Sequence, residues 1–404
     1  MSQARTGQAP PAQIRTDWTG VAFGTVLGIV AAYQQFKVPP AIPILLREYG
    51  YGSVLAGGLM SVYALMGLVL SLAVGRAVSR RGWAPVVATG LVLMLAGNAL
   101  GLAWPENGAA VLAARALEGA SYAVLGLVGP ILANASGAGA HMPLVFALTA
   151  AWIPHGQIAA GVLAGATPGE WRWLWWGGLL FTALVLAWSL RLGLRRRFAG
   201  FAMGGRAEGA RLTARERLGM VLVAATFLLW SMQYFAFMTW LPEYLVTARG
   251  LDAGAAIRGY LTPVVTLLVF VYLAAFLLRA GASLGALLIA TLFMQAGAWL
   301  VMPMLGNSPW AFALLILWGI GAGITPTCLF GFPATLVQRA DARTEAFGIM
   351  MTGRNLGVLI GPVLLGAAIE RTGWSAAFPV CATLATGAMA VSIALALLRR
   401  AGRA

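Results

Sequence analysis

Long apolar runs separated by short polar segments follow one another along the whole chain. A run of about 20 apolar residues is long enough to cross the hydrocarbon core of a bilayer as a helix. The first run is overlong and carries Pro39, Pro40 and Pro43 near its outer end. The pattern predicts an all-α membrane protein with twelve transmembrane helices, at 18–46, 53–75, 84–103, 109–135, 143–166, 173–190, 218–246, 259–278, 282–302, 310–335, 345–368 and 375–398.

The arginines between these runs predict the orientation of the chain. With both termini in the cytoplasm, nineteen arginines fall in cytoplasmic segments. Such an excess follows the positive-inside rule, and an odd number of spans would mix the two sets of loops. We therefore expect both termini in the cytoplasm of a bacterium and the helices in its inner membrane. The opposite loops hold only Arg47, Arg172, Arg249, Arg258 and Arg371.

The longest polar stretch lies in the middle of the chain and suggests two halves. Across it, the spacing of Gln34, Phe36 and Pro43 recurs in Gln233, Phe235 and Pro242. Repeated halves around a site at the membrane midplane are a recurring plan of transporters. The predicted parts are a cytoplasmic tail 1–17, a six-helix bundle 18–190, a basic cytoplasmic linker 191–217, a second six-helix bundle 218–398 and a tail 399–404.

Composition narrows the class of protein further. Hydrophobic residues make up 60% of the chain and charged residues 10%, against about 25% charged in soluble domains. The net charge of +15 does not indicate a nucleic-acid partner, because the arginines lie in short loops between apolar runs rather than in a stripe with aromatic residues. The sequence contains no P-loop pattern, no metal-ligand spacing and no nucleophile beside a base. We expect neither an enzyme nor a cofactor.

Three motifs carry a resemblance to a known superfamily. They are Gly75-Arg-Ala-Val-Ser-Arg-Arg-Gly82 after the second span, Arg115-Ala-Leu-Glu118-Gly119 in the fourth, and Arg354-Asn355-Leu-Gly357 in the eleventh. In this order on twelve spans, the chain resembles the major facilitator superfamily. It departs from the family at Ser79, usually aspartate, and at Glu118, usually glutamine. The resemblance implies a secondary transporter that works by alternating access of two halves.

The seventh span suggests a branch of that superfamily. Trp240-Leu241-Pro242, with Tyr234 and Phe235 upstream, is similar to the cyanate and 2-nitroimidazole porters. In that branch the first helix usually has an Arg-Pro pair, where this chain has Lys37-Val38-Pro39.

Basic groups inside the predicted spans indicate the charge of the solute. Ionisable residues in a span cost a few kcal/mol each, so they mark candidate sites. Lys37 is the only lysine of the chain, and Arg354 lies near the middle of the eleventh span. We expect the two to clamp an anion from opposite halves, with Gln34 and Asn355 beside them. Alternatively, Lys37 extends to the outer interface, and Arg354 hydrogen-bonds to backbone carbonyls. Tyr33, Gln233 and Tyr234 are weaker candidates for the same cavity.

An acidic group in the fourth span is the leading candidate for proton coupling. Arg115 and Glu118 are three residues apart and share a helix face, so they can pair. The pair is either the coupling site or purely structural. His155 in the fifth span is the second candidate, because imidazole titrates near neutral pH. Alternatively, His155 is a structural hydrogen-bonding group.

Together these patterns predict a monomeric secondary transporter in a lipid bilayer. Intramembrane charge is mainly basic, which favours a small anionic solute, and proton-coupled import is the leading mode. Uniport and anion exchange remain open. One alternative is a proton-coupled exporter of drugs or lipophilic compounds, which requires an unpaired carboxylate in the cavity. Another is a membrane sensor that binds its solute without transporting it.

Overall fold

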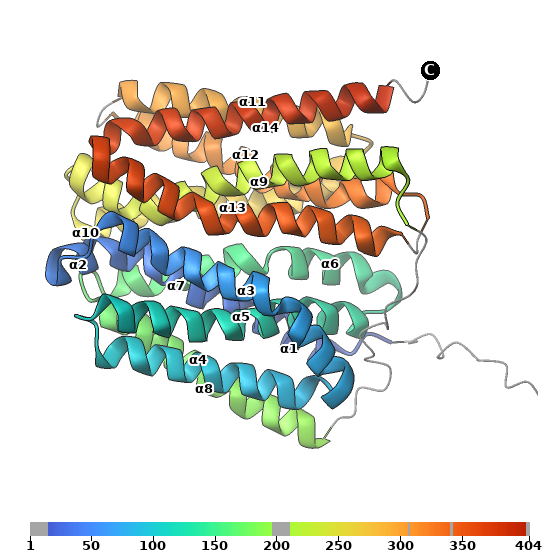
Figure 1. Cartoon of the computed structure of the whole chain (residues 1–404), viewed down its shortest axis with the longest axis horizontal. Helices are drawn as coiled ribbons and strands as arrows, with labels where there is room; N and C mark the ends of the chain where they lie inside the picture. Colours follow the sequence, from blue (N-terminus) through green and yellow to red (C-terminus); the bar gives the residue numbers. More distant parts are fainter. Residues whose placement is uncertain (1–14, 196–210, 306–307, 340–341, 401–404) are drawn as a thin grey trace, which may run out of the picture.

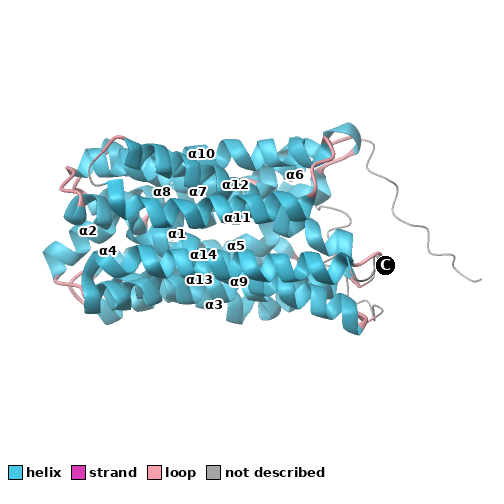
Figure 2. Cartoon of the chain, turned by 90° about the horizontal axis from the view of Figure 1, so that it is seen from above, coloured by secondary structure: helices cyan, strands magenta, loops and turns pink. Residues whose placement is uncertain are grey.

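The computed structural model describes residues 15–195, 211–305, 308–339 and 342–400. Its long helices lie side by side along one common direction (Figure 1; Figure 2). The helices are α1 (Trp18–Phe36), α2 (Val38–Tyr49), α3 (Ser53–Arg81), α4 (Trp83–Ala103), α5 (Gly108–Ser136), α6 (Met142–Ala150), α7 (Trp152–Ala166), α8 (Trp171–Arg195), α9 (Ala214–Glu243), α10 (Ala253–Arg279), α11 (Leu284–Val301), α12 (Trp310–Leu336), α13 (Arg343–Thr372) and α14 (Ala377–Arg400). Short turns complete the list: η1 (Gly139–His141), η2 (Tyr244–Ala248, a π-helix), η3 (Met302–Leu305) and η4 (Gly373–Ala376).

The described helices confirm the predicted fold class. By length and composition, ten stretches are able to cross a membrane, or eleven when the bent pair of α6 and α7 is one span. One of the ten, Glu345–Arg400, contains both α13 and α14, which run between the same two ends of the molecule (Figure 1). Counted as two passes, these helices bring the described chain to the expected twelve.

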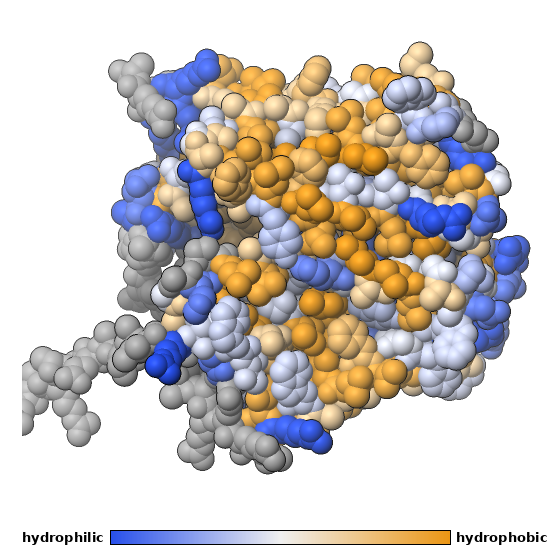
Figure 3. All heavy atoms as spheres, turned by 180° about the vertical axis from the view of Figure 1, so that it is seen from behind, coloured by the Kyte–Doolittle hydropathy of each residue, from blue (hydrophilic) through white to orange (hydrophobic). Residues whose placement is uncertain are grey.

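The surface fits a protein embedded in lipid. Apolar side chains cover the middle of the face in Figure 3, whereas hydrophilic residues gather toward its two ends. Phe293, Phe276 and Leu180 remain well exposed on α11, α10 and α8. Large exposed apolar areas are unfavourable in water but match hydrocarbon. We call the end that holds the start of α1 and the end of α14 the cytoplasmic end, as the arginines predict, and the opposite one the outer end.

Proline and glycine change three details of the predicted spans. The first span breaks at Lys37, because Pro39 and Pro40 lack the N–H groups that would continue the helix. The fifth span bends by 53° between α6 and α7, just before Pro154. The expected loop 75–82 is instead the last two turns of α3, which ends at Gly82 with φ of 79°.

Glycines allow α13 to lie directly against α9. Gly353, Gly357 and Gly361 recur every four residues on one face of α13, and a Cβ atom on any of them would collide with backbone carbonyls of α9. Such small-residue faces are how membrane helices approach closely. These three glycines therefore form a packing surface, and this surface fixes where Arg354 lies.

The two halves meet along several helix pairs. Helix α3 packs on α13, α2 on α9, and α7 on α10. The centre of the predicted linker 191–217, most of the tail 1–17 and residues 401–404 lie outside the described residues. The boundaries of the two six-helix bundles therefore stay a prediction.

Candidate functional site

A charged cluster lies inside the N-terminal half. It comprises Gln34, Lys37, Asn98, Arg115 and Glu118, and the side chain of each is fully buried. The break between α1 and α2 places Lys37 at the end of α1, one turn beyond Gln34. Gly178 of α8 makes room for the cluster, because a Cβ atom there would meet the amides of Gln34 and Asn98 within 3 Å.

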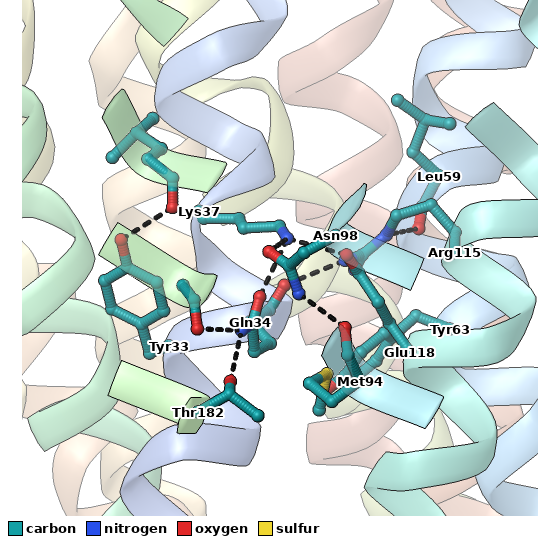
Figure 4. Close-up of polar contacts among 12 residues, drawn as sticks. Tyr33, Gln34, Lys37, Leu59, Tyr63, Met94, Asn98, Arg115, Glu118 and Thr182 are labelled. Atoms are coloured by element: carbon teal, nitrogen blue, oxygen red, sulfur yellow. Dashed lines mark hydrogen bonds and ion pairs between the residues drawn. The ribbon is translucent and has the colours of Figure 1, made fainter. Parts of the chain in front are cut away.

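The Lys37 ammonium uses all of its hydrogen-bond donors inside this cluster. Its Nζ lies 2.7 Å from each of three acceptors, Gln34 Oε1, Asn98 Oδ1 and Glu118 Oε1 (Figure 4). An ammonium has three N–H groups, so none is left for a solute in this arrangement. Nζ also lies 4.4 Å from the centre of the Trp175 ring, a favourable cation–π position. Lys37 therefore does not extend to the interface, and that alternative is wrong.

Arg115 completes the cluster from α5. Its Nη1 pairs with Glu118 Oε2 and also donates to the Gln34 carbonyl at 2.9 Å, while Nε donates to the Leu59 carbonyl at 2.9 Å (Figure 4). The guanidinium lies over the Tyr63 ring at 4.4 Å. Its Nη2 is buried without a hydrogen-bond partner. The predicted Arg115–Glu118 pair is thus present, and Lys37 joins it.

The cluster carries an excess positive charge. With Lys37 and Arg115 protonated and Glu118 ionised, two cations share one carboxylate, which leaves a net +1 in a fully buried place. Uncompensated charge in a low dielectric is costly. The cluster is therefore stabilised by any further negative charge that comes close to it.

The C-terminal half has a neutral counterpart around Gln233, the repeat partner of Gln34. Gln233 Nε2 donates to Gln295 Oε1 at 2.7 Å, and Gln233 Oε1 accepts from Trp299 Nε1 at 2.8 Å. Trp230 Nε1 also donates to Gln295, and Gln295 Nε2 donates to the Thr325 hydroxyl. We call Trp230, Gln233, Gln295, Trp299 and Thr325 the neutral cluster.

Between the two clusters, aromatic and amide groups join the halves. The rings of Phe36 and Phe235 stack with centroids 5.8 Å apart. The Tyr234 hydroxyl donates to Gln157 Oε1, and Gln157 Nε2 donates to the Tyr260 hydroxyl, each at 3.0 Å. Residues related by the repeat therefore meet at the contact between the halves.

Arg354 lies at this contact with donors to spare. Its Nη1 donates to Asn355 Oδ1 at 2.9 Å, and its guanidinium carbon lies 5.8 Å from the centre of the Phe235 ring. A guanidinium has five N–H groups. Within the described residues, only the one that Arg354 donates to Asn355 has a hydrogen-bond partner. Arg354 is 6% exposed, so the guanidinium is not completely shut off from solvent.

The structure brings some of the predicted site residues together and separates others. Gln34, Lys37, Arg115 and Glu118 form one cluster, whereas no contact in the described part of the chain joins Lys37 to Arg354. The Tyr33 hydroxyl donates to the Leu174 carbonyl at 2.7 Å. His155 Nδ1 lies 2.7 Å from the Ala151 carbonyl on its own helix, which fits the structural alternative for this residue.

Several important residues escaped the sequence analysis. Asn98 and Gln295 are single amides in the third and ninth spans, and Gln157 lies in the fifth. Gln34 was predicted from its position three residues before Lys37. An amide inside an apolar span is the signal that would have found these three. Trp175 follows Trp171 and Trp173 near the start of α8, where tryptophans are typical of a membrane interface, yet it is 1% exposed and lies beneath Lys37.

A bundle of membrane-length helices in two contacting parts, with buried charges in its interior, defines the class of polytopic solute transporters. The family model described as Major Facilitator Superfamily matches residues 24–342. The chain therefore belongs to the major facilitator superfamily, and it is a multi-pass membrane protein and secondary transporter rather than an enzyme. A search of curated proteins finds no match.

Proposed function

We propose that the transporter imports a small anion, a carboxylate or an inorganic anion such as cyanate, together with a proton. The observation that carries the proposal is the burial of two basic side chains, Lys37 and Arg115, on the one carboxylate of Glu118, with Arg354 and its free donors in the opposite half. A guanidinium binds planar anions in a bidentate fork. Arg354 is the first anchor of the solute, and Asn355 lies beside it. The cyanate and 2-nitroimidazole porter branch stays a prediction.

Charge balance in the charged cluster couples the binding of a proton to the binding of the anion. When Glu118 takes up a proton, its attraction for Lys37 and Arg115 is lost, and the buried charge rises from +1 to +2. Lys37 is then free to turn one donor toward the solute, which closes the predicted clamp with Arg354. A proton and an anion together leave the net charge at +1, so each favours binding of the other, and the linkage is reciprocal.

The exporter alternative receives less support from this site. It requires an unpaired carboxylate in the cavity, whereas Glu118 has a cation on each oxygen. His155 remains a weaker coupling candidate because its ring contacts a backbone carbonyl and Tyr272 rather than a charge. A sensor would have the same binding site and is distinguished only by the absence of flux.

A thermal-unfolding screen of the purified protein tests the proposal. Cyanate, acetate and benzoate represent anions, urea a neutral solute, and tetraphenylphosphonium a lipophilic cation. A ligand at a hundredfold excess over its Kd stabilises the folded state by about 2.7 kcal/mol. We expect at least one anion to raise the melting temperature, Arg354→Gln to abolish the rise, and labelled anion to accumulate in proteoliposomes with an acidic exterior. Stabilisation by tetraphenylphosphonium alone would contradict the proposal and favour the exporter.

A further inference from the structure

A second buried carboxylate lies far along α9 from the neutral cluster. Glu243 is the last residue of α9 and is 8% exposed. Its Oε2 is buried and has no hydrogen-bond partner. Within the described residues, Glu243 forms no ion pair. The hydroxyl of Thr247 donates to the backbone carbonyl of Glu243. The sequence pattern did not indicate a site at this residue, because it lies near the end of a predicted span, beside Pro242.

Glu243 belongs to the place where the halves close the outer end. Helix α2 packs on α9 there, and Pro43 and Pro242 line one small cavity between them. At the same end of the molecule, the Val54 amide of α3 donates to Glu370 of α13 at 3.2 Å, and Gly366 of α13 leaves no room for a Cβ atom against the Ser53 carbonyl. We call α2, the start of α3 and the outer ends of α9 and α13 the outer seal.

One turn before Glu243, Trp240 connects α9 to the rest of the outer seal. Its Nε1 donates to the Pro362 carbonyl of α13 at 2.9 Å, and Gly57 of α3 approaches that same carbonyl. The rigid α-helix ends one residue after Pro242 and continues as the π-helix η2. Glu243 therefore sits at the junction between a fixed helix and an irregular turn, which is a common form of functional sites.

The charges around Glu243 do not neutralise it. Arg47 is close enough to act on it electrostatically, yet the two form no ion pair within the described chain, and Arg47 is exposed to solvent, which screens its charge. Glu370 is engaged with Val54. The other ionisable groups at the outer ends of the elements packed on α9 are Glu48 and Tyr49 on α2, Arg371 on α13, Tyr244 on η2 with Arg249 directly after it, and Arg258 on α10.

We propose that Glu243 is a proton-binding site of the outer seal, which takes up a proton from the outer solution when the halves meet and releases it when they part. An ionised carboxylate with one oxygen buried and without a hydrogen-bond partner is costly, and protonation relieves that cost. Once the seal opens, water reaches the group, and a solvated glutamate ionises with a pKa of about 4.3. External acid thereby favours the sealed arrangement. The site needs no solute and acts independently of Glu118.

Spin-label distances across the outer end test this proposal. Labels go on Glu106→Cys, between α4 and α5, and Trp310→Cys, at the start of α12, because both positions are exposed. Cys328 and Cys381, which are buried, are replaced by alanine. Double electron–electron resonance in lipid nanodiscs without solute then gives the ratio of sealed to open molecules between pH 5 and pH 9.

We expect the ratio of sealed to open molecules to rise as the pH falls, by up to about tenfold per pH unit for one coupled proton. In Glu243→Gln, which mimics the protonated group, the ratio is expected to be high and independent of pH. Glu48→Gln, at an exposed position near the end of α2, is the matched control that keeps the pH response. A pH response unchanged by Glu243→Gln would overturn the proposal, as would its loss in Glu118→Gln alone. Neither result depends on whether the solute is an anion.

Discussion

Around Gln34 in the N-terminal half and Gln233 in the C-terminal half, the chain builds buried polar clusters of different character. The first contains two cations and one carboxylate, whereas the second satisfies its amides with indole N–H groups and a hydroxyl. Gln34 and Gln233 occupy the same position in the repeat, and the cluster around Gln233 packs without charged groups. Packing alone therefore does not require charged groups around Gln34. The charge of the first cluster thus calls for a functional explanation, and a neutral cluster of similar size is its natural control.

Removal of the carboxylate is expected to have the largest effect. Glu118→Ala leaves Lys37 and Arg115 buried without an opposite charge, and breaking a buried pair in this way costs about 3–5 kcal/mol. Gln295→Ala in the neutral cluster leaves uncharged polar groups without hydrogen-bond partners, which costs about 1–3 kcal/mol of stability. Thermal unfolding in detergent measures both. Equal destabilisation would show that charge adds nothing to the first cluster.

Substitution of Arg354 tests solute binding separately from the stability of the two clusters. Loss of a charge-assisted hydrogen bond costs about 1.5–3 kcal/mol, so Arg354→Gln is expected to weaken anion binding by roughly tenfold to a hundredfold. Titration of the melting temperature with cyanate or acetate measures the change. Arg279→Gln, at an exposed position on the cytoplasmic end of α10, is the matched control and keeps wild-type affinity. An equal loss in the control would mean that the anion senses only overall charge.

Trp175 tests whether the aromatic ring holds the ammonium in place. A desolvated cation–π contact is worth up to about 2 kcal/mol, and Trp175→Leu keeps the site apolar while removing the ring. We predict that the lost contact accounts for about 0.5–2 kcal/mol of destabilisation at pH 7, beyond the packing cost of the smaller side chain, measured by thermal unfolding. In the double variant Lys37→Met/Trp175→Leu this part of the cost is expected to disappear while the packing cost remains. If the full cost persists, the ring contributes only packing.

The bond between Tyr234 and Gln157 is expected to give the smallest effect. Tyr234→Phe removes one neutral hydrogen bond between the halves, which contributes about 0.5–1.5 kcal/mol. The melting temperature should fall slightly while anion affinity stays within a factor of about three. Tyr272→Phe, at a partly exposed position on α10, serves as control. A large loss of affinity in Tyr234→Phe would place this hydroxyl in the solute site instead.

The sequence predicted the spans and the local pairs but not the way in which they assemble. Gln34 with Lys37, and Arg115 with Glu118, each lie three residues apart on one helix, so helix periodicity alone brings them together. The meeting of these two pairs depends on how α1 and α5 pack and on the break at Lys37, where prolines end the helix. Asn98 and Trp175 come from two further helices, and no local rule links them to Lys37.

If Glu118 couples the proton to the anion, the affinity for the anion depends on pH through this one carboxylate. The Kd of cyanate and of acetate is measured from thermal shifts between pH 5 and pH 9, for the wild type and for Glu118→Gln. We predict that wild-type affinity increases by up to about tenfold per unit of falling pH, and that Glu118→Gln binds tightly at every pH. The same slope in both proteins would contradict this coupling.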